Sequence, residues 1–222
     1  MELSRLLEIE PGVTALIGSG GKTTAMYLLA GELARRGRVL CTTTTHILPP
    51  ARLPVLANPS AAEVEKALAG ENCLCLGTPG EEGKLTAPGL PVAELRALAD
   101  YVLVEADGSR GLPLKAHLAH EPVVPPEAGR TIWLVGASGV GRPVEKAVHR
   151  PARFCALTGL PPGGLVTPES LAAALLAEGL AETVFVNQVE GEADWACARV
   201  LAAALPWPVY AGALRRREWR CL

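Results

Sequence analysis

The stretch VTALIGSGGKTT, residues 13–24, decides the fold of this chain. Its first part, residues 13–17, is a short apolar run ended by glycines, which is typical of a buried strand in a parallel sheet. Residues 22–36 then carry apolar side chains at helical spacing, and residues 38–43 are predicted to form the second strand. The stretch therefore predicts a strand, a glycine loop and a helix that open a right-handed βαβ unit.

The glycine loop of this unit is suited to holding phosphate. Glycines allow backbone N–H groups to turn inward and approach phosphate oxygens closely. The start of the helix adds a partial positive charge. Lys22 is expected to reach the β- and γ-phosphates, and the Thr23 hydroxyl is expected to bind Mg²⁺. The residues predicted to bind a nucleoside triphosphate, ATP or GTP, are Gly18, Ser19, Gly20, Gly21, Lys22, Thr23 and Thr24.

One position departs from the widespread pattern G-x-x-x-x-G-K-[ST]. Leu16 stands where that pattern has its first glycine. In this respect the segment resembles the G-x-x-G-K-T-T loop of Mur-type ligases and, more distantly, the loops of the MinD and metallochaperone GTPases. The alternative interpretation is a glycine-rich turn that only joins a strand to a helix.

The rest of the chain alternates strands with helices. This order predicts an α/β fold that is P-loop NTPase-like, with a mostly parallel sheet and helices on both faces. We expect one nucleotide-binding domain over residues 1–222, in which residues 112–165 could form a lid or a small subdomain. Residues 107–130 are rich in Pro and Gly and are expected to be irregular. Further strands are predicted at 72–77, 101–105, 131–135, 183–186 and 209–211, and helices at 61–69, 91–99, 168–177 and 193–205.

Composition and charge argue against several classes of protein. The 222 residues are 49% hydrophobic, enough for a substantial core, and the net charge of -2 gives no basic field for nucleic acid. No apolar segment reaches membrane-spanning length. We therefore expect a cytoplasmic protein that binds neither nucleic acid nor membrane. The basic cluster at the C-terminus is expected to be a solvated or frayed tail, the alternative being a tail that closes over phosphate; it consists of Arg215, Arg216, Arg217 and Arg220.

Two acids and a threonine run follow predicted parallel strands. Side chains at the carboxyl ends of such strands face the crevice where ligands bind. Glu105 and Asp107 end an apolar strand, and we expect both to lie in the site, with at least one holding Mg²⁺. Together with Lys22 they are the candidate catalytic residues. Residues 42–45 are all threonine, and one of them, with Thr44 as the candidate, could contact Mg²⁺ or phosphate, although β-branched strand residues are the plain alternative.

The irregular segment after Asp107 offers polar groups for a second substrate or partner. Ser109, Arg110 and Lys115 could stabilise transferred phosphate or an acidic substrate. His120 and Glu121 lie near His117 in a segment that contains prolines. Because these three residue types can bind metals, a metal site is a further alternative. Further along, Asn187 ends a predicted strand in a partial match to the N-K-x-D motif of GTPases, so it could contact the nucleotide base or serve only as a turn residue.

Taken together, these segments resemble the YqeC family of selenium-dependent molybdenum hydroxylase accessory proteins. The Glu-Ala-Asp-Gly-Ser segment and the His-Glu-Pro segment are the most specific parts of the likeness. The resemblance adds His149 and Arg150 to the candidate residues for a substrate or partner. The matching segments are residues 17–24, 42–45, 104–109, 115–125, 149–151, 157–159, 167–169 and 185–188.

The resemblance implies a bacterial cytosolic protein that matures a selenium-dependent molybdenum hydroxylase. Combined with the loop, it predicts a Mg²⁺-dependent nucleoside-triphosphate-binding protein that acts as an NTPase, with that hydroxylase or its cofactor as a partner. Three alternatives stay open. They are a small-molecule kinase or Mur-like ligase, a nucleotide-gated delivery protein, and a binding module without hydrolysis.

Overall fold

The computed structural model describes residues 1–222 and contains two compact units. Unit 1 comprises Met1–Leu16, Thr23–Gly108 and Val123–Arg130, and unit 2 comprises Ile17–Lys22, Ser109–Pro122 and Thr131–Leu222. Residues 112–165 therefore belong to unit 2 except for Val123–Arg130. The expectation of one domain with a lid over residues 112–165 stays a prediction.

Unit 1 is built on a parallel sheet. Four strands pair side by side in parallel, in the order β1 (Gly12–Gly18), β7 (Tyr101–Glu105), β2 (Val39–Thr43) and β5 (Cys73–Pro79). On β5, a further strand β4 (Val55–Ala57) pairs in parallel, and β6 (Leu85–Thr86) pairs antiparallel with both β5 and β3 (His46–Ile47). Leu16 of β1 and Thr43 of β2 both lie opposite Glu105 of β7, so three strand ends meet beside this acid.

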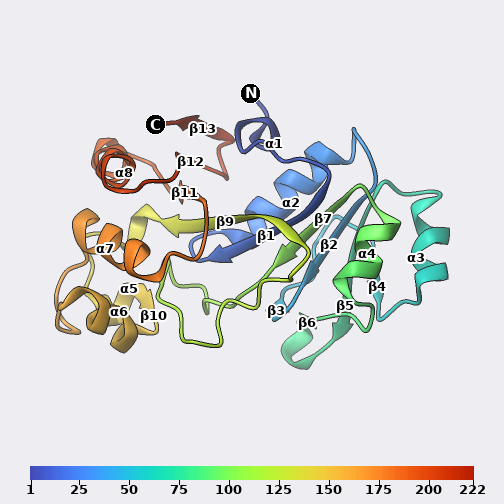
Figure 1. The fold of residues 1–222 in the computed structure, drawn as a ribbon, viewed down its shortest axis with the longest axis horizontal. Helices are drawn as coiled ribbons and strands as arrows, with labels where there is room; N and C mark the ends of the chain where they lie inside the picture. Colours follow the sequence, from blue (N-terminus) through green and yellow to red (C-terminus); the bar gives the residue numbers. More distant parts are fainter. The chain divides into compact units, whose positions relative to one another are not determined.

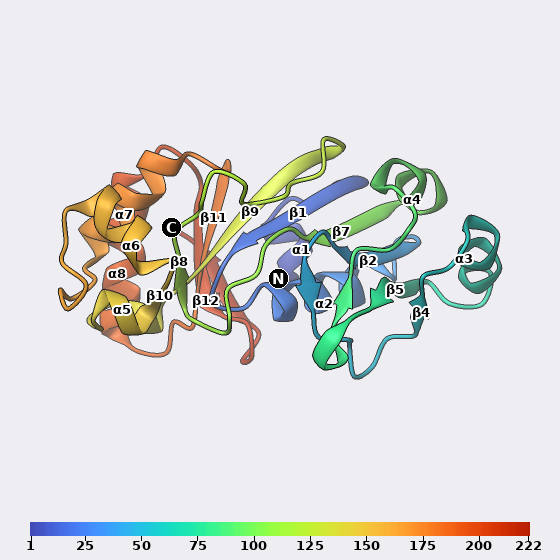
Figure 2. The same ribbon diagram turned by 90° about the horizontal axis from the view of Figure 1, so that it is seen from below.

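Helices cover both faces of the unit 1 sheet (Figures 1 and 2). The helices α3 (Ala61–Leu68) and α4 (Val92–Leu98) pack Val64 and Leu95 against Leu40 of β2 and its neighbours. The helix α2 (Lys22–Leu33) puts Tyr27 beside Cys41 and Cys75, which lie on the opposite face because side chains alternate along a strand. The prediction of helices on both faces is thus confirmed in this unit.

Local sequence accounts for where these helices begin and end. Ser60 caps α3 with a capping box that includes Glu63, as a serine before an amphipathic segment predicts. The helix α2 ends at Leu33, earlier than the expected residue 36, and the last residues form a turn. The Glu32 carboxylate near its end accepts hydrogen bonds from the backbone N–H groups of Leu3 (3.1 Å) and Ser4 (2.7 Å) and so holds the start of the short helix α1 (Leu3–Leu6).

Unit 2 combines paired strands with a group of helices. The strands β9 (Ala128–Gly136), β11 (Thr183–Asn187) and β12 (Val209–Ala213) are parallel, and β13 (Glu218–Cys221) runs antiparallel to β12. Two short strands, β8 (Leu114–Lys115) and β10 (Val148–His149), form a separate parallel pair. Figure 2 shows the helices grouped together in this unit, and they are α5 (Val144–Ala147), α6 (Pro151–Thr158), α7 (Pro168–Glu178) and α8 (Glu192–Ala204). Short 3-10 turns lie at Glu81–Gly83 in unit 1 and Ala137–Gly139 in unit 2.

Two sequence expectations need correction. The arginines of the C-terminal cluster are exposed to solvent, as expected, but they do not form a frayed tail, because β13 pairs with β12 and the Arg220 guanidinium lies 3.8 Å from the ring centroid of Trp195. The stacking gives the arginine a favourable cation–π contact. The segment 107–130 is also not wholly irregular, since it contains β8 and the first residues of β9.

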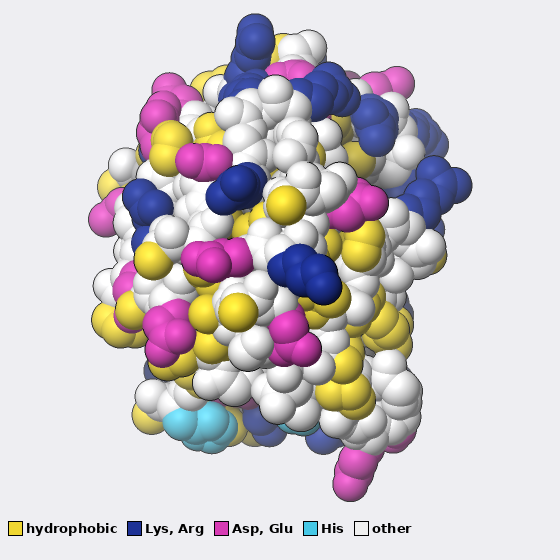
Figure 3. Space-filling model, turned by 90° about the vertical axis from the view of Figure 1, so that its right-hand side faces the viewer, with side chains coloured by type: hydrophobic (Ala, Val, Ile, Leu, Met, Phe, Trp, Pro, Cys, Tyr) yellow, Lys and Arg dark blue, Asp and Glu magenta, His cyan; other side chains and the backbone are white.

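The distribution of charged side chains on the surface and the length of the helices agree with the composition of the chain. Figure 3 shows side chains of both charges, separated by uncharged surface, on the face that carries α3 and α4. Among the helices, none combines the length and apolar character that crossing a bilayer requires.

Candidate functional site

The loop after β1 has the backbone conformation that its glycines predict. In unit 2, Gly18 and Gly20 have φ values of +85° and +81°, which only glycine adopts easily. The chain also passes close to β9: a Cβ on Gly20 would lie 2.5 Å from the backbone nitrogen of Gly136. The Ser19 N–H donates to the Leu134 carbonyl over 2.8 Å, and its hydroxyl donates to the Leu112 carbonyl. The loop is therefore held in one shape by unit 2.

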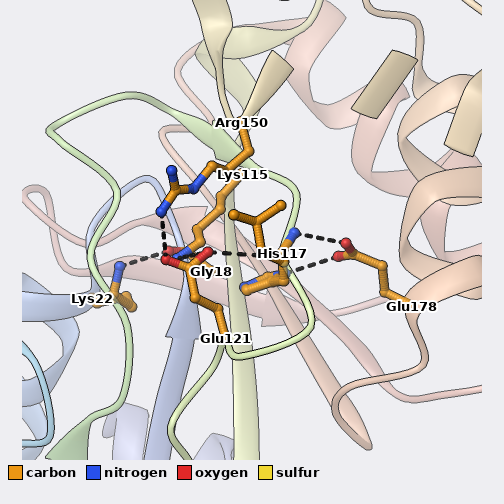
Figure 4. A network of polar contacts seen from close by, with 8 residues as sticks. Gly18, Lys22, Lys115, His117, Glu121, Arg150 and Glu178 are labelled. Carbon is orange, nitrogen blue, oxygen red and sulfur yellow. Dashed lines mark hydrogen bonds and ion pairs between the residues drawn. The ribbon is translucent and has the colours of Figure 1, made fainter. Parts of the chain in front are cut away.

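Lys22 folds back over this loop. Its Nζ donates a hydrogen bond of 2.6 Å to the Gly18 carbonyl, and the residue is 3% exposed (Figure 4). A lysine ammonium that is bound to the loop's own carbonyl lies next to the position where loop amides can bind an anion. The arrangement places one positive charge and a helix start, that of α2, at the same loop.

Asn187 at the end of β11 fixes the loop from one side. Its Nδ2 donates to the Gly20 carbonyl over 2.6 Å, and its Oδ1 accepts from the Leu214 N–H over 3.0 Å. A Cβ on Gly21 would lie 2.4 Å from Nδ2, so this loop position is also filled. Both ends of the side-chain amide therefore bind backbone groups of the chain, and the residue is 6% exposed.

In unit 1, the residue after Lys22 contacts the acid at the end of β7. The Thr23 hydroxyl donates to Oε2 of Glu105 over 2.7 Å, and the Glu105 residue is 6% exposed. The carboxylate and the hydroxyl are the oxygen ligands that Mg²⁺ prefers. A cation bound here would contact both oxygens in place of the hydrogen bond between them. The Thr23 hydroxyl and the Glu105 carboxylate are therefore suitable ligands for the predicted Mg²⁺.

The threonine run of residues 42–45 is organised around the same strand end. Thr43 donates through Oγ1 to the Glu105 carbonyl over 2.8 Å and accepts from the Thr45 N–H over 2.9 Å. Thr44 donates through Oγ1 to the Val123 carbonyl over 2.8 Å. Asp107, two residues beyond Glu105, is buried at 1% exposure. The hydroxyls of Thr43 and Thr44 thus bind backbone carbonyls in this structure.

Three residues of the predicted partner set, Lys115, Glu121 and Arg150, come together in unit 2 (Figure 4). Glu121 accepts from Arg150 Nη2 over 3.1 Å and lies 3.4 Å from Lys115 Nζ. His149 is the register partner of Lys115 in the β8–β10 pair. Residues that are far apart in the sequence therefore form one charged cluster of Lys115, Glu121, His149 and Arg150.

The charges of this cluster shift the pKa values of two members. Burial acts to raise the pKa of Glu121, but the hydrogen bond from Arg150 and the charge of Lys115 outweigh it and hold this pKa below its usual value. Burial, together with the positive charges of Lys115 and Arg150, lowers the pKa of His149. Glu121 is therefore ionised and His149 neutral near pH 7.

The remaining predicted residues lie outside these contacts. Ser109 is half-buried, and Arg110 and His120 are exposed. His117 does not join His120 and Glu121 in a metal site: it contacts Glu178, and no cluster of three His, Cys, Asp or Glu side chains suits a metal ion. Of the cysteines, Cys41, Cys73 and Cys75 are buried free thiols.

Two residues of unit 2 gave no clear signal in the sequence. Glu178 binds His117 from 61 positions away, and Trp133 stands edge-on to the His117 ring with the ring centroids 5.3 Å apart. Trp133 also packs beneath the loop, since a Cβ on Gly18 would lie 2.4 Å from its Cδ1. Glu178 ends a helix and Trp133 lies in an apolar strand, so local pattern alone indicated core or surface positions.

The geometry defines the class of this protein. A parallel strand, a glycine loop with its lysine, and a helix that starts at that lysine make it an α/β protein of the P-loop NTPase-like kind. The family model "YqeC protein" matches residues 14–152. The protein YqeC of Escherichia coli is 36% identical over 171 residues, which cover 73% of this chain and 67% of that relative. The chain therefore belongs to the YqeC family.

A solved structure gives a more distant likeness. The crystal structure of the Signal Recognition Particle 54 kDa protein from Aeropyrum pernix in complex with GDP has a TM-score of 0.44 and 15% sequence identity to this chain. The match covers 96% of this chain but only 44% of that protein's chain, so this chain spans less than half of its length.

Proposed function

We propose that this protein binds the triphosphate of ATP or GTP at the loop of residues 18–24 and that it hydrolyses the nucleotide with Mg²⁺. The observation that carries the proposal is the Lys22 ammonium, bound 2.6 Å from the Gly18 carbonyl over a loop whose glycines have positive φ. A phosphate group is the anion that such a loop, lysine and helix start together favour.

In this proposal each part of the loop has a separate task. The backbone N–H groups and Lys22 hold the β- and γ-phosphates, with Lys22 leaving the Gly18 carbonyl for a phosphate oxygen. Thr23 and Glu105 hold Mg²⁺, and a bound Mg²⁺ would neutralise part of the phosphate charge. Asp107 is the second candidate acid at this strand end. Asn187 keeps the Gly20 carbonyl turned away from the phosphates, because its amide holds that oxygen.

The test is calorimetric titration of the full chain with Mg–ATP and Mg–GTP. The variant Lys22→Ala should weaken binding of the preferred nucleotide by roughly tenfold or more, about 1.4 kcal/mol, because one charge-assisted contact to phosphate is lost. Lys146→Ala is the matched control, since that lysine is 69% exposed and pairs only with Glu145 in its own helix. Equal affinity of the wild type and Lys22→Ala would remove the loop from the proposal.

The fate of the γ-phosphate separates the reactions that fit this site. Transfer to water is the proposed NTPase reaction. Transfer to a metabolite would make the protein a kinase or Mur-like ligase, and turnover that rises only with a partner enzyme would make it a nucleotide-gated delivery protein. Phosphate release measured with and without added partner distinguishes these outcomes.

Membership of the YqeC family supports a proposed pathway as well. The family resemblance implies maturation of a selenium-dependent molybdenum hydroxylase, with the hydroxylase or its cofactor as the partner. Purified hydroxylase should then bind this chain and change its nucleotide turnover. A hydroxylase that gains full activity in cells lacking this protein would contradict the assignment.

A further inference from the structure

Unit 2 contains a pocket that the proposed nucleotide site does not use. Its volume is about 330 Å³, in the range of pockets that hold small molecules. Both charged and apolar side chains line it. The residues that matter here are His117, Glu121, Arg153 and Glu178, with Leu118 and Leu180.

A buried histidine–glutamate pair forms one wall of this pocket (Figure 4). Glu178 accepts from the His117 backbone N–H over 2.7 Å, and its other oxygen lies 2.8 Å from Nδ1 of the same residue. The two side chains are only 2% and 3% exposed. Because the carboxylate binds the ring and the backbone at once, it fixes the orientation of the imidazole. A ligand in the pocket therefore meets a histidine of defined geometry.

The carboxylates around this pocket already have cationic or N–H partners within the protein. Glu121 is bound by Arg150 and Lys115, and Glu178 is bound by His117. Arg153, in contrast, lines the pocket from α6 with no carboxylate partner, and its side chain is accessible to solvent. The positive charge of the Arg153 guanidinium is thus not balanced by a carboxylate of the protein, which favours an anionic ligand.

We propose that this pocket is a second binding site, for a small organic acid. The carboxylate of the acid pairs with the Arg153 guanidinium, a polar substituent meets His117, and the carbon skeleton lies against Leu118 and Leu180. An organic acid is favoured over inorganic phosphate because apolar side chains of the pocket can contact its carbon skeleton, which phosphate lacks. Binding of the acid alone is independent of nucleotide, whereas its part as a second substrate rests on the proposed function.

Trp133 joins this pocket to the phosphate loop. It contacts the His117 ring edge-on, with an interplanar angle of 74°, and packs against Gly18, whose carbonyl binds Lys22. One side chain therefore separates the histidine of the pocket from the loop. A ligand that moves His117 changes the surroundings of Trp133 as well, which gives binding an optical signal in the indole fluorescence.

The test uses the chain of residues 1–222 without nucleotide. Pyruvate, succinate and inorganic phosphate are titrated at millimolar concentrations, with heat and tryptophan fluorescence recorded. We expect saturable binding of at least one carboxylate, a fluorescence change that Trp133→Phe removes, and phosphate binding that is weaker. Arg153→Gln should weaken carboxylate binding by roughly tenfold, since a paired guanidinium is lost.

Arg142→Gln is the matched control, because Arg142 is an exposed arginine of unit 2 outside the pocket. It should bind the carboxylate like the wild type. The proposal is overturned by the absence of saturable carboxylate binding, by Arg153→Gln binding as well as the control, or by phosphate binding more tightly than both acids. None of these results depends on Lys22, so they leave the proposed nucleotide site to its own test.

Discussion

At the scale of single residues, Asn187 holds the glycine loop through both ends of its side-chain amide. A strand-end asparagine within a partial N-K-x-D match suggested contact with a base, yet its amide binds Gly20 and Leu214 at both ends. The same side chain can hold the loop only while both hydrogen bonds are made. We infer a positioning residue, whose loss affects every nucleotide equally.

The variant Asn187→Asp tests this inference. A carboxylate cannot donate to the Gly20 carbonyl and would repel it, so the loop should lose its shape. Affinity for Mg–ATP and Mg–GTP should fall together by roughly tenfold, about 1.4 kcal/mol, which is the scale of one or two lost hydrogen bonds. Gln188→Asn is the control, because Gln188 binds Ser138 and not the loop. A changed ratio of ATP to GTP affinity would instead indicate base recognition.

Glu105 is the acid that the geometry favours as the metal ligand, through its 2.7 Å contact with Thr23. Removing Mg²⁺ with EDTA should weaken nucleotide binding by the wild type. In Glu105→Gln the difference between affinities with and without Mg²⁺ should shrink, because the neutral amide is a poorer ligand for a hard cation. Calorimetry in both buffers measures this, with the exposed Glu127→Gln as control. A Glu105→Gln protein with the full Mg²⁺ effect would point to Asp107.

His149 gives the stability of the protein a predictable pH dependence. Burial and two nearby cations lower its pKa in the folded state. At a pH below the ordinary histidine pKa of about 6.5, His149 is protonated in the unfolded chain but stays neutral in the folded one. The free energy of unfolding should therefore fall as the pH drops from about 7 to about 5. Urea unfolding of His149→Gln should show a flatter curve over this range, while the exposed His120→Gln should follow the wild type. An unchanged slope in His149→Gln would refute the argument.

At the scale of elements, glycine has opposite effects on stability in the loop and in α2. Gly20 has positive φ and lies against β9, whereas Gly31, in the exposed part of α2, would place a Cβ in open space. Gly20→Ala should lower the free energy of unfolding by more than about 1 kcal/mol, from strain and collision. Gly31→Ala should raise it by about 0.5–1 kcal/mol, since alanine favours the helix. Two denaturation curves measure both effects, and equal shifts would contradict this account.

The elements that sequence predicted well are those with strong local pattern. The strands β1, β7 and β11 are continuous apolar runs, and α3 and α7 begin with capping residues at Ser60 and Thr167. The elements that it missed depend on distant partners. The strand β13 contains polar and charged residues and exists because it pairs with β12, and the two-residue strands β8 and β10 pair across the length of a long segment.

At the scale of the whole molecule, the phosphate loop could be predicted from its own residues, but the second pocket could not. The loop's glycines, lysine and threonines are consecutive. The pair of His117 and Glu178 is 61 positions apart, and only the fold brings it together. The cluster of Lys115, Glu121, His149 and Arg150 lies between these cases, since the family resemblance pointed to its members and the structure showed their contacts.

Nucleotide binding should stabilise the protein as a whole. A ligand that binds only the folded state adds about 2.7 kcal/mol at a concentration one hundred times its Kd. The unfolding midpoint should therefore rise with added Mg-nucleotide, and it should rise less in Lys22→Ala at the same concentration, because tenfold weaker binding leaves about 1.4 kcal/mol of this stabilisation. Scanning calorimetry provides this comparison, and an equal rise in both proteins would place the ligand elsewhere.

The most direct measurement of the central claim is a crystal structure of the protein with Mg²⁺ and a non-hydrolysable ATP or GTP analogue. The account predicts the triphosphate against the backbone N–H groups of residues 18–24, with Lys22 Nζ moved from the Gly18 carbonyl to a phosphate oxygen and Mg²⁺ beside Thr23 and Glu105. A nucleotide bound elsewhere, with Lys22 still on the Gly18 carbonyl, would contradict it.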